Sequence, residues 1–101
     1  ARDGLLFRSL LVGVLCNEAA FDAKEGAVGD PTETALLDAA HSCGVEVARE
    51  RERFPKLAER PFDAATKRMT TAHRANERER IVLLKGAPGA VLDACANIVS
   101  A

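Results

Sequence analysis

The residue types that most often carry out catalysis are sparse in this chain. The two histidines, His41 and His73, have no cysteine, serine or carboxylate at a spacing typical of nucleophilic catalysis. We therefore expect both to be structural histidines, at the surface or partly buried. A small hydrolase that uses Cys43 or His41 is the least favoured alternative.

The three cysteines form neither a disulfide nor a metal-ligand pattern. Cys16, Cys43 and Cys95 are odd in number and far apart, and no CxxC pair occurs. This pattern argues against a disulfide framework and against a zinc site. The sequence thus predicts three buried, reduced thiols and no metal.

A lysine at the end of an apolar run points to binding rather than catalysis. The stretch RIVLLKGAPGAV, residues 80–91, places Lys85 directly after IVLL and before Gly86. Neither GxxxxGK[ST] nor GxGxxG occurs, so the usual backbone cradles for phosphate are missing. A glycine within a strand fits a place where another group must come close to the backbone. On the residues alone, Lys85 is expected to be a solvated lysine at a strand end, and binding without catalysis is the more natural expectation for the chain.

Length, composition and charge limit the possible classes of protein. A chain of 101 residues makes one domain with a modest core. Its 48% apolar and 29% charged residues are typical of a folded, soluble domain. The net charge of -1 and the lack of Trp and Tyr argue against nucleic acid as a partner. The longest apolar stretch, residues 10–16, is too short to span a bilayer, so no direct membrane contact is expected.

Two helices are predicted in the first half of the chain. Apolar residues from Leu5 to about Cys16 form a broad helical face, with Asp3 as the expected N-cap. Residues 19–30 predict a loop with one or two short strands. The second helix starts in GDPTETALL, where Asp30 is the expected cap, Pro31 suits the first turn and Glu33 completes a capping box. It ends before Gly44, and its expected apolar face consists of Leu36, Ala39, Ala40 and Cys43.

The second half predicts strands between shorter helices. Alternating charges in residues 45–54 indicate a solvated short helix or turn. Residues 69–73 and 81–84 suit an antiparallel hairpin with a loop near Asn76 and a buried IVLL strand, and Pro61 belongs at a strand edge or start. A final helix is expected over residues 89–99, with a face of Val91, Leu92 and Cys95. The predicted class is α+β, an antiparallel β-sheet flanked by helices.

Four segments of the chain resemble one known family. GDPTETALL, PFDAATKRMTT and LLKGAPGAV follow one another in the order and at the spacing found in the nucleotide-binding domain of P-type ATPases. CNEAAF, residues 16–21, is similar to a segment that precedes the first of these motifs in that family. The resemblance is strongest to the cation pumps that include bacterial calcium-type transporters. It implies that residues 1–101 are a single nucleotide-binding domain from a larger membrane transporter.

The resemblance also implies a role for five residues. Phe62 matches the aromatic residue on which adenine stacks, and Glu33 the acidic residue that faces the adenine amino group. Lys67 matches a lysine near the phosphates, Lys85 a lysine at the mouth of the pocket, and Gly86 a glycine that lets adenine approach the backbone. The implied ligand is ATP with Mg²⁺. A Phe ring, mobile ammonium groups and a carboxylate acceptor suit these roles physically.

Two positions depart from the family pattern. Gly89 replaces the acidic residue that ends K-G-A-P-E, and Ala64 replaces a serine near the implied pocket. The family domain also continues to a further strand, so the sheet is expected to lack its C-terminal strand. The phosphorylated aspartate is missing as well, so this chain alone should bind ATP without turning it over.

The resemblance places the chain in a larger assembly. Its implied partners are the phosphorylation and actuator domains of the same parent protein. The implied location is the cytosolic side of an integral membrane protein, in the plasma membrane of a bacterium. The alternative from a different class is a docking module without nucleotide binding, which would use the charged RERER segment, residues 49–53, and nearby lysines.

Overall fold

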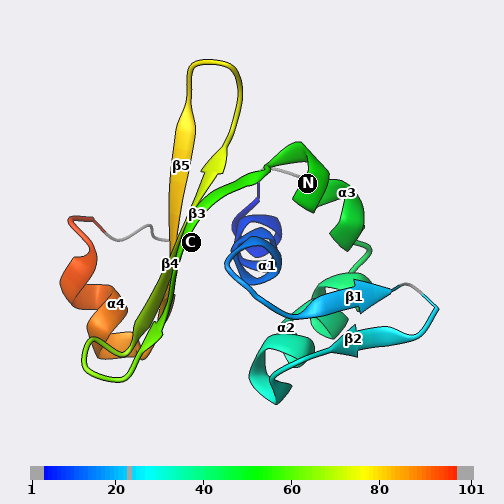
Figure 1. The fold of residues 1–101 in the computed structure, drawn as a ribbon, viewed down its shortest axis with the longest axis horizontal. Coiled ribbons are helices and arrows are strands. Elements are labelled where there is room, and N and C mark those ends of the chain that lie inside the picture. The colour runs from blue at the N-terminus through cyan, green and yellow to red at the C-terminus, as the bar shows by residue number, and fades with distance from the viewer. Residues whose placement is uncertain (1–3, 23, 98–101) are drawn as a thin grey trace.

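Helices alternate with antiparallel strands in the computed structural model, which describes residues 4–22 and 24–97 (Figure 1). The predicted α+β class is confirmed, while Asp3, the expected first N-cap, lies outside the described residues. No helix in these two ranges is long and apolar enough to cross a membrane. In chain order the elements are α1 (Leu5–Leu15), β1 (Ala20–Asp22), β2 (Gly26–Val28), α2 (Pro31–Ser42), α3 (Val47–Arg53), β3 (Lys56–Asp63), β4 (Arg68–Arg74), β5 (Arg80–Gly86) and α4 (Pro88–Ala94).

The strands form two antiparallel sheets. β1 and β2 make a small hairpin, and the larger sheet has the order β3-β4-β5. The predicted hairpin is confirmed as β4 and β5, which pair without interruption from Arg68↔Gly86 to Arg74↔Arg80. β3 adds a strand on the other side of β4, and its register shifts between Arg60 and Asp63. Pro61 lies at this shift on an edge strand, as predicted, because it has no N–H to give to the ladder.

Helix α1 lies at the centre of the molecule, with the larger sheet on one side and α2, α3 and the β1–β2 hairpin on the other (Figure 1). Its buried C-terminal end joins both parts. The thiol of Cys16, which follows α1, points to the carbonyl oxygens of Met69 at 3.6 Å and Leu83 at 3.9 Å. The other side of α1 contributes to a buried cluster of Val14, Ala19, Leu37, Ala40, Val45 and Val47.

The start of α2 is as predicted, but its buried face is rotated. The Asp30 side chain caps the helix by accepting the N–H groups of Thr32 at 3.0 Å and Glu33 at 3.3 Å. Leu37 and Ala40 are buried, whereas Ala39 and Cys43, placed on the apolar face by the sequence, are exposed. Two members of the predicted face are confirmed, since Ala40 is buried and the half-buried Leu36 lies against Gly13 of α1. Cys43 already belongs to the C-cap.

Four further expectations are wrong in part. The short charged helix α3 exists, but Glu50 on it is buried rather than solvated. In the IVLL run of β5, Ile81, Leu83 and Leu84 are half-buried, whereas Val82 is exposed instead of buried because the face of the sheet that carries it is not covered at that point. The last helix ends at Ala94, has no buried residue, and leaves Leu92 and Cys95 exposed. The expectation of three buried thiols holds only for Cys16, the C-cap of α1, which packs against the larger sheet; Cys43 and Cys95, the C-caps of α2 and α4, are exposed.

Candidate functional site

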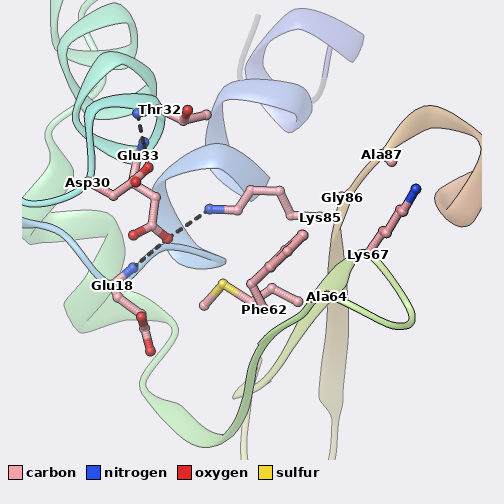
Figure 2. A pocket seen from close by; sticks show the side chains of 11 residues that line it. Glu18, Asp30, Thr32, Glu33, Phe62, Ala64, Lys67, Lys85, Gly86 and Ala87 are labelled. Atoms are coloured by element: carbon pink, nitrogen blue, oxygen red, sulfur yellow. Dashed lines mark hydrogen bonds and ion pairs between the residues drawn. The ribbon is translucent and has the colours of Figure 1, made fainter.

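A cleft of about 770 Å³ opens between the first turn of α2 and the end of the larger sheet (Figure 2). It is lined from one side by the loop after α1 and the start of α2, and from the other by β3, β5 and the β3–β4 turn. All five residues implied by the resemblance lie on its wall, although they come from three separate segments. The lining residues are Glu18, Asp30, Thr32, Glu33, Phe62, Ala64, Lys67, Met69, Lys85, Gly86 and Ala87.

The Glu33 carboxylate is held by two groups at one end of the cleft. Its Oε2 accepts the backbone N–H of Glu18 at 3.0 Å and the ammonium of Lys85 at 2.9 Å. The side chains of Glu33 and Lys85 are only 14% and 24% exposed, so this ion pair is poorly screened by water. The predicted capping box is therefore realised only by Asp30, since the Glu33 carboxylate reaches across to other segments.

Lys85 reaches the cleft because of the alternation of side chains along β5. It pairs with Met69 of β4 on the sheet face that is turned toward α1. The IVLL run that precedes it places this lysine at the end of the strand, where α2 begins on the opposite wall. Lys85 is thus partly buried and bound to Glu33, rather than a solvated lysine at a strand end.

Phe62 presents its ring to the cleft from β3. It is 61% exposed, although apolar side chains of this size usually gain by burial. Figure 2 shows the ring between Glu33 and Lys67, beside Ala64. The exposed ring is available to a flat apolar ligand in the cleft.

Lys67 occupies the β3–β4 turn in a strained backbone conformation. Its φ is 56°, a left-handed value that non-glycine residues seldom adopt. The turn is closed by a hydrogen bond from Lys67 N–H to the Asp63 carbonyl at 2.6 Å, and the Lys67 carbonyl accepts the Ala87 N–H at 3.1 Å. Its exposed side chain lies across Phe62 from Glu33 (Figure 2). Strain of this kind is found most often at functional sites.

Gly86 is required by this turn. A Cβ atom at Gly86 would collide with the Lys67 carbonyl oxygen and lie 2.8 Å from Arg68 Cα. The close backbone approach that a glycine in a strand predicts is therefore made by the protein's own chain. It ties the end of β5 to the turn that carries Lys67.

Several lining residues were not singled out from the sequence as site residues. Asp30, Thr32 and Ala87 belong to the motifs named above, and Glu18 belongs to CNEAAF. The motifs therefore pointed to these segments, but not to these side chains as part of the cleft. Ala64, the missing hydroxyl, does line the cleft. Gly89, the other departure, lies in the first turn of α4 and does not line the cleft, and a Cβ atom there would have no neighbour within 4 Å.

Glu18, which lines the cleft, and Glu59 form a pair of carboxyl groups whose pKa values shift in opposite directions. A hydrogen bond between the Glu18 and Glu59 side chains raises the pKa of Glu18 and lowers the pKa of Glu59. Lys56 binds Glu59 at 2.6 Å and helps keep it ionised. Glu18 is therefore the member of the pair that takes up a proton first as the pH falls.

The other candidate residues have structural surroundings. Both ring nitrogens of buried His73 are bonded, to Phe54 O at 2.9 Å and Thr71 Oγ1 at 2.8 Å. His41 is exposed and contacts the Phe21 ring. Neither histidine lines the cleft, and neither does Cys43.

The RERER segment is largely engaged within the fold. Arg51 donates to the Val14 carbonyl at the end of α1, at 3.2 and 3.3 Å. Arg49 pairs with Glu46, and Arg53 with Glu50. These internal contacts leave fewer of its charges for a partner protein.

Comparison with known proteins identifies the family. Residues 6–101 match the family model of the P-type ATPase cytoplasmic domain N. The chain is 36% identical over 96 residues to the sodium/potassium-transporting ATPase subunit alpha-1 of Oreochromis mossambicus, and 33% identical over 98 residues to the alpha subunit of Tetronarce californica. These matches cover 84% and 87% of the chain but only 9% and 10% of the relatives, so the chain spans about a tenth of their length. The chain belongs to the P-type ATPase family, as its cytoplasmic domain N.

Proposed function

We propose that this chain binds ATP in the cleft between α2 and the end of the larger sheet. The observation that carries the proposal is that one cleft is lined by all five residues, Glu33, Phe62, Lys67, Lys85 and Gly86. A volume of about 770 Å³ lies within the range of small-molecule sites. Family membership supports the same assignment.

The geometry favours one orientation of the nucleotide. Adenine stacks on the exposed Phe62 ring, and its amino group donates to the Glu33 carboxylate. The phosphates then extend past Phe62 toward Lys67, whose ammonium is free in solvent to meet them. Lys85 binds Glu33 in the ligand-free chain, so it sits at the end of the cleft that receives the base. Gly86 acts by holding the turn that carries Lys67. The adenine ring approaches the backbone of Gly86 from the side of the cleft.

At the level of the parent protein, we propose a cation-transporting ATPase that uses ATP with Mg²⁺. The domain presents the γ-phosphate to an aspartate on a separate phosphorylation domain, so the isolated chain binds without turnover. The relatives are named as sodium/potassium transporters, whereas the sequence motifs favoured bacterial calcium-type pumps. The transported ion and the bacterial plasma membrane stay predictions, because ion choice rests on membrane residues outside this chain.

The experiment is a titration of the ¹⁵N-labelled chain with ATP in the presence of Mg²⁺. We expect amide shifts concentrated at the five site residues and at the cleft residues Glu18 and Ala87, with phosphate release at background. Titration with Mg²⁺ and inorganic phosphate alone is the control for charge effects. Amides that do not move at millimolar ATP would overturn the proposal and favour the docking alternative.

A further inference from the structure

The side chain of Asn17 joins three segments beneath the cleft. It is only 3% exposed and follows Cys16, the C-cap of α1. Its Nδ2 donates to the carbonyls of Gly13 at 2.9 Å and Glu33 at 3.0 Å, and its Oδ1 accepts the Ala19 N–H at 2.8 Å. The amide thus uses both of its donor hydrogens and its acceptor. An aspartate would lose both donors, and a serine is too short to reach all three partners.

Asn17 and its neighbour hold Glu33 at both ends. Asn17 binds the backbone carbonyl of Glu33, and the N–H of Glu18 binds Glu33 Oε2 at 3.0 Å. Lys85 binds the same oxygen. The position of Glu33 is thus set by two consecutive residues of the loop after α1 together with Lys85 of β5, all of which reach the first turn of α2 from outside it.

The contact between Asn17 and Glu33 is not needed to form α2 itself. The helix is already capped by Asp30, and α1 and α2 pack through buried apolar side chains. The Asn17 amide adds direction, because a hydrogen bond weakens steeply when its angle or length changes. Burial protects it from exchange with water, so loss of the amide leaves carbonyl and N–H groups without their partner.

We propose that Asn17 is a positioning residue for base recognition, and that it holds the first turn of α2 so that the Glu33 carboxylate faces the adenine amino group. This inference rests on the proposed binding of ATP. Asn17 does not touch the nucleotide and acts through Glu33 alone. Its loss therefore affects discrimination for the amino group more than it affects binding of the phosphates.

The test compares ATP with purine riboside 5′-triphosphate, which lacks only the 6-amino group. Dissociation constants with Mg²⁺ are measured for a parent chain that carries Gly89→Ala alone, and for Asn17→Ser, Asn17→Asp and the control Ala40→Gly made in that parent chain. Ala40 is buried in α2, the helix that carries Glu33, and its side chain makes no hydrogen bond. All four chains carry Gly89→Ala to support folding, and circular dichroism at the working temperature verifies that each is folded.

We expect the parent chain to prefer ATP by about tenfold, as for one hydrogen bond to a charged acceptor. In a folded Asn17 variant this preference should fall below about threefold, while Ala40→Gly keeps it. An Asn17 variant that is folded and keeps the full preference overturns the inference and leaves ATP binding intact. Equal binding of both nucleotides by the parent chain also overturns it, whereas binding of neither overturns the proposed function.

If neither Asn17 variant folds, hydrogen exchange of the Glu18 amide in the unaltered chain decides. If Asn17 holds this loop, the hydrogen bond from the Glu18 N–H to Glu33 opens only when the hydrogen bonds of the Asn17 side chain open. Slow exchange of the Glu18 amide, at a rate that rises together with that of the Asn17 side-chain amide, therefore supports the inference. Fast exchange at Glu18 in the folded chain contradicts it.

Discussion

The Lys67 carbonyl oxygen fills the space that a Cβ atom at Gly86 would occupy. This contact joins two motifs that lie 19 positions apart, and it fixes the strained turn of Lys67 against the end of β5. The glycine that seemed to make room for a ligand makes room first for the protein's own backbone. Substitutions at these two residues therefore test the architecture of the site separately from its chemistry.

Replacement of Gly86 by alanine should destabilise the fold. The added Cβ would lie 2.8 Å from Arg68 Cα, so backbone on one side must shift. We expect a loss of about 1 to 3 kcal/mol in the free energy of unfolding, measured by urea denaturation. Gly89→Ala is the matched control, because nothing lies within 4 Å of its Cβ and it stands in a helix. It should be stabilising by about 0.4 to 1 kcal/mol, and an equal loss in both variants would contradict the close contact.

Replacement of Lys67 separates backbone strain from charge. Lys67→Gly removes both the ammonium and the strain of a φ of 56°, whereas Lys67→Ala removes only the ammonium. We expect the free energy of unfolding of Lys67→Gly to exceed that of Lys67→Ala by about 1 kcal/mol, because glycine adopts a left-handed conformation without strain. Both variants should bind Mg²⁺-ATP more weakly to the same extent in a calorimetric titration. Equal stability of the two variants would show that the turn is not strained in solution.

Local sequence patterns predicted the residues of the site better than they predicted the packing of the core. Asp30 and Pro31 marked the start of α2, and the apolar IVLL run placed Lys85 at a strand end, because caps, turns and strand ends are set by neighbouring residues. The motifs then brought Glu33, Phe62 and Lys67 together, and these residues do line one cleft. What local patterns could not give was the partner of each residue across the chain.

Long-range contacts account for the errors. Helical periodicity placed Ala39 and Cys43 on the buried face of α2, whereas the fold buries Leu37 in one cluster with Val14 of α1 and leaves Ala39 exposed. The bond between Asn17 and Glu33 joins residues 16 positions apart and has no signature in either segment. The apolar run of β5 predicts a buried strand, yet the sheet face that carries Val82 is not covered there, and local sequence does not show which faces other elements cover.

Phe62→Ala should weaken nucleotide binding without affecting stability. Loss of a stacking surface costs about 1 to 3 kcal/mol for each base, which corresponds to roughly five- to 150-fold in the dissociation constant. The ring is 61% exposed, so its removal should leave the urea midpoint close to that of the unaltered chain. Leu92→Ala removes another exposed apolar side chain outside the cleft and should leave affinity unchanged. Unchanged affinity in Phe62→Ala would place the base elsewhere.

Cys16 should make the fold less stable in alkaline solution. Burial raises the pKa of its thiol above the ordinary value of about 9.0. The unfolded chain then loses this proton at a lower pH than the folded chain, so the stabilising effect is complete below pH 9 and declines as the pH rises further. Urea denaturation at pH 8 and pH 10 should show an extra loss of up to about 1 kcal/mol in the unaltered chain relative to Cys16→Ala. Cys43→Ala, at an exposed thiol, should retain the full alkaline loss. If Cys16→Ala and the unaltered chain lose the same free energy between these pH values, the thiol between α1 and the sheet is accessible to water in solution.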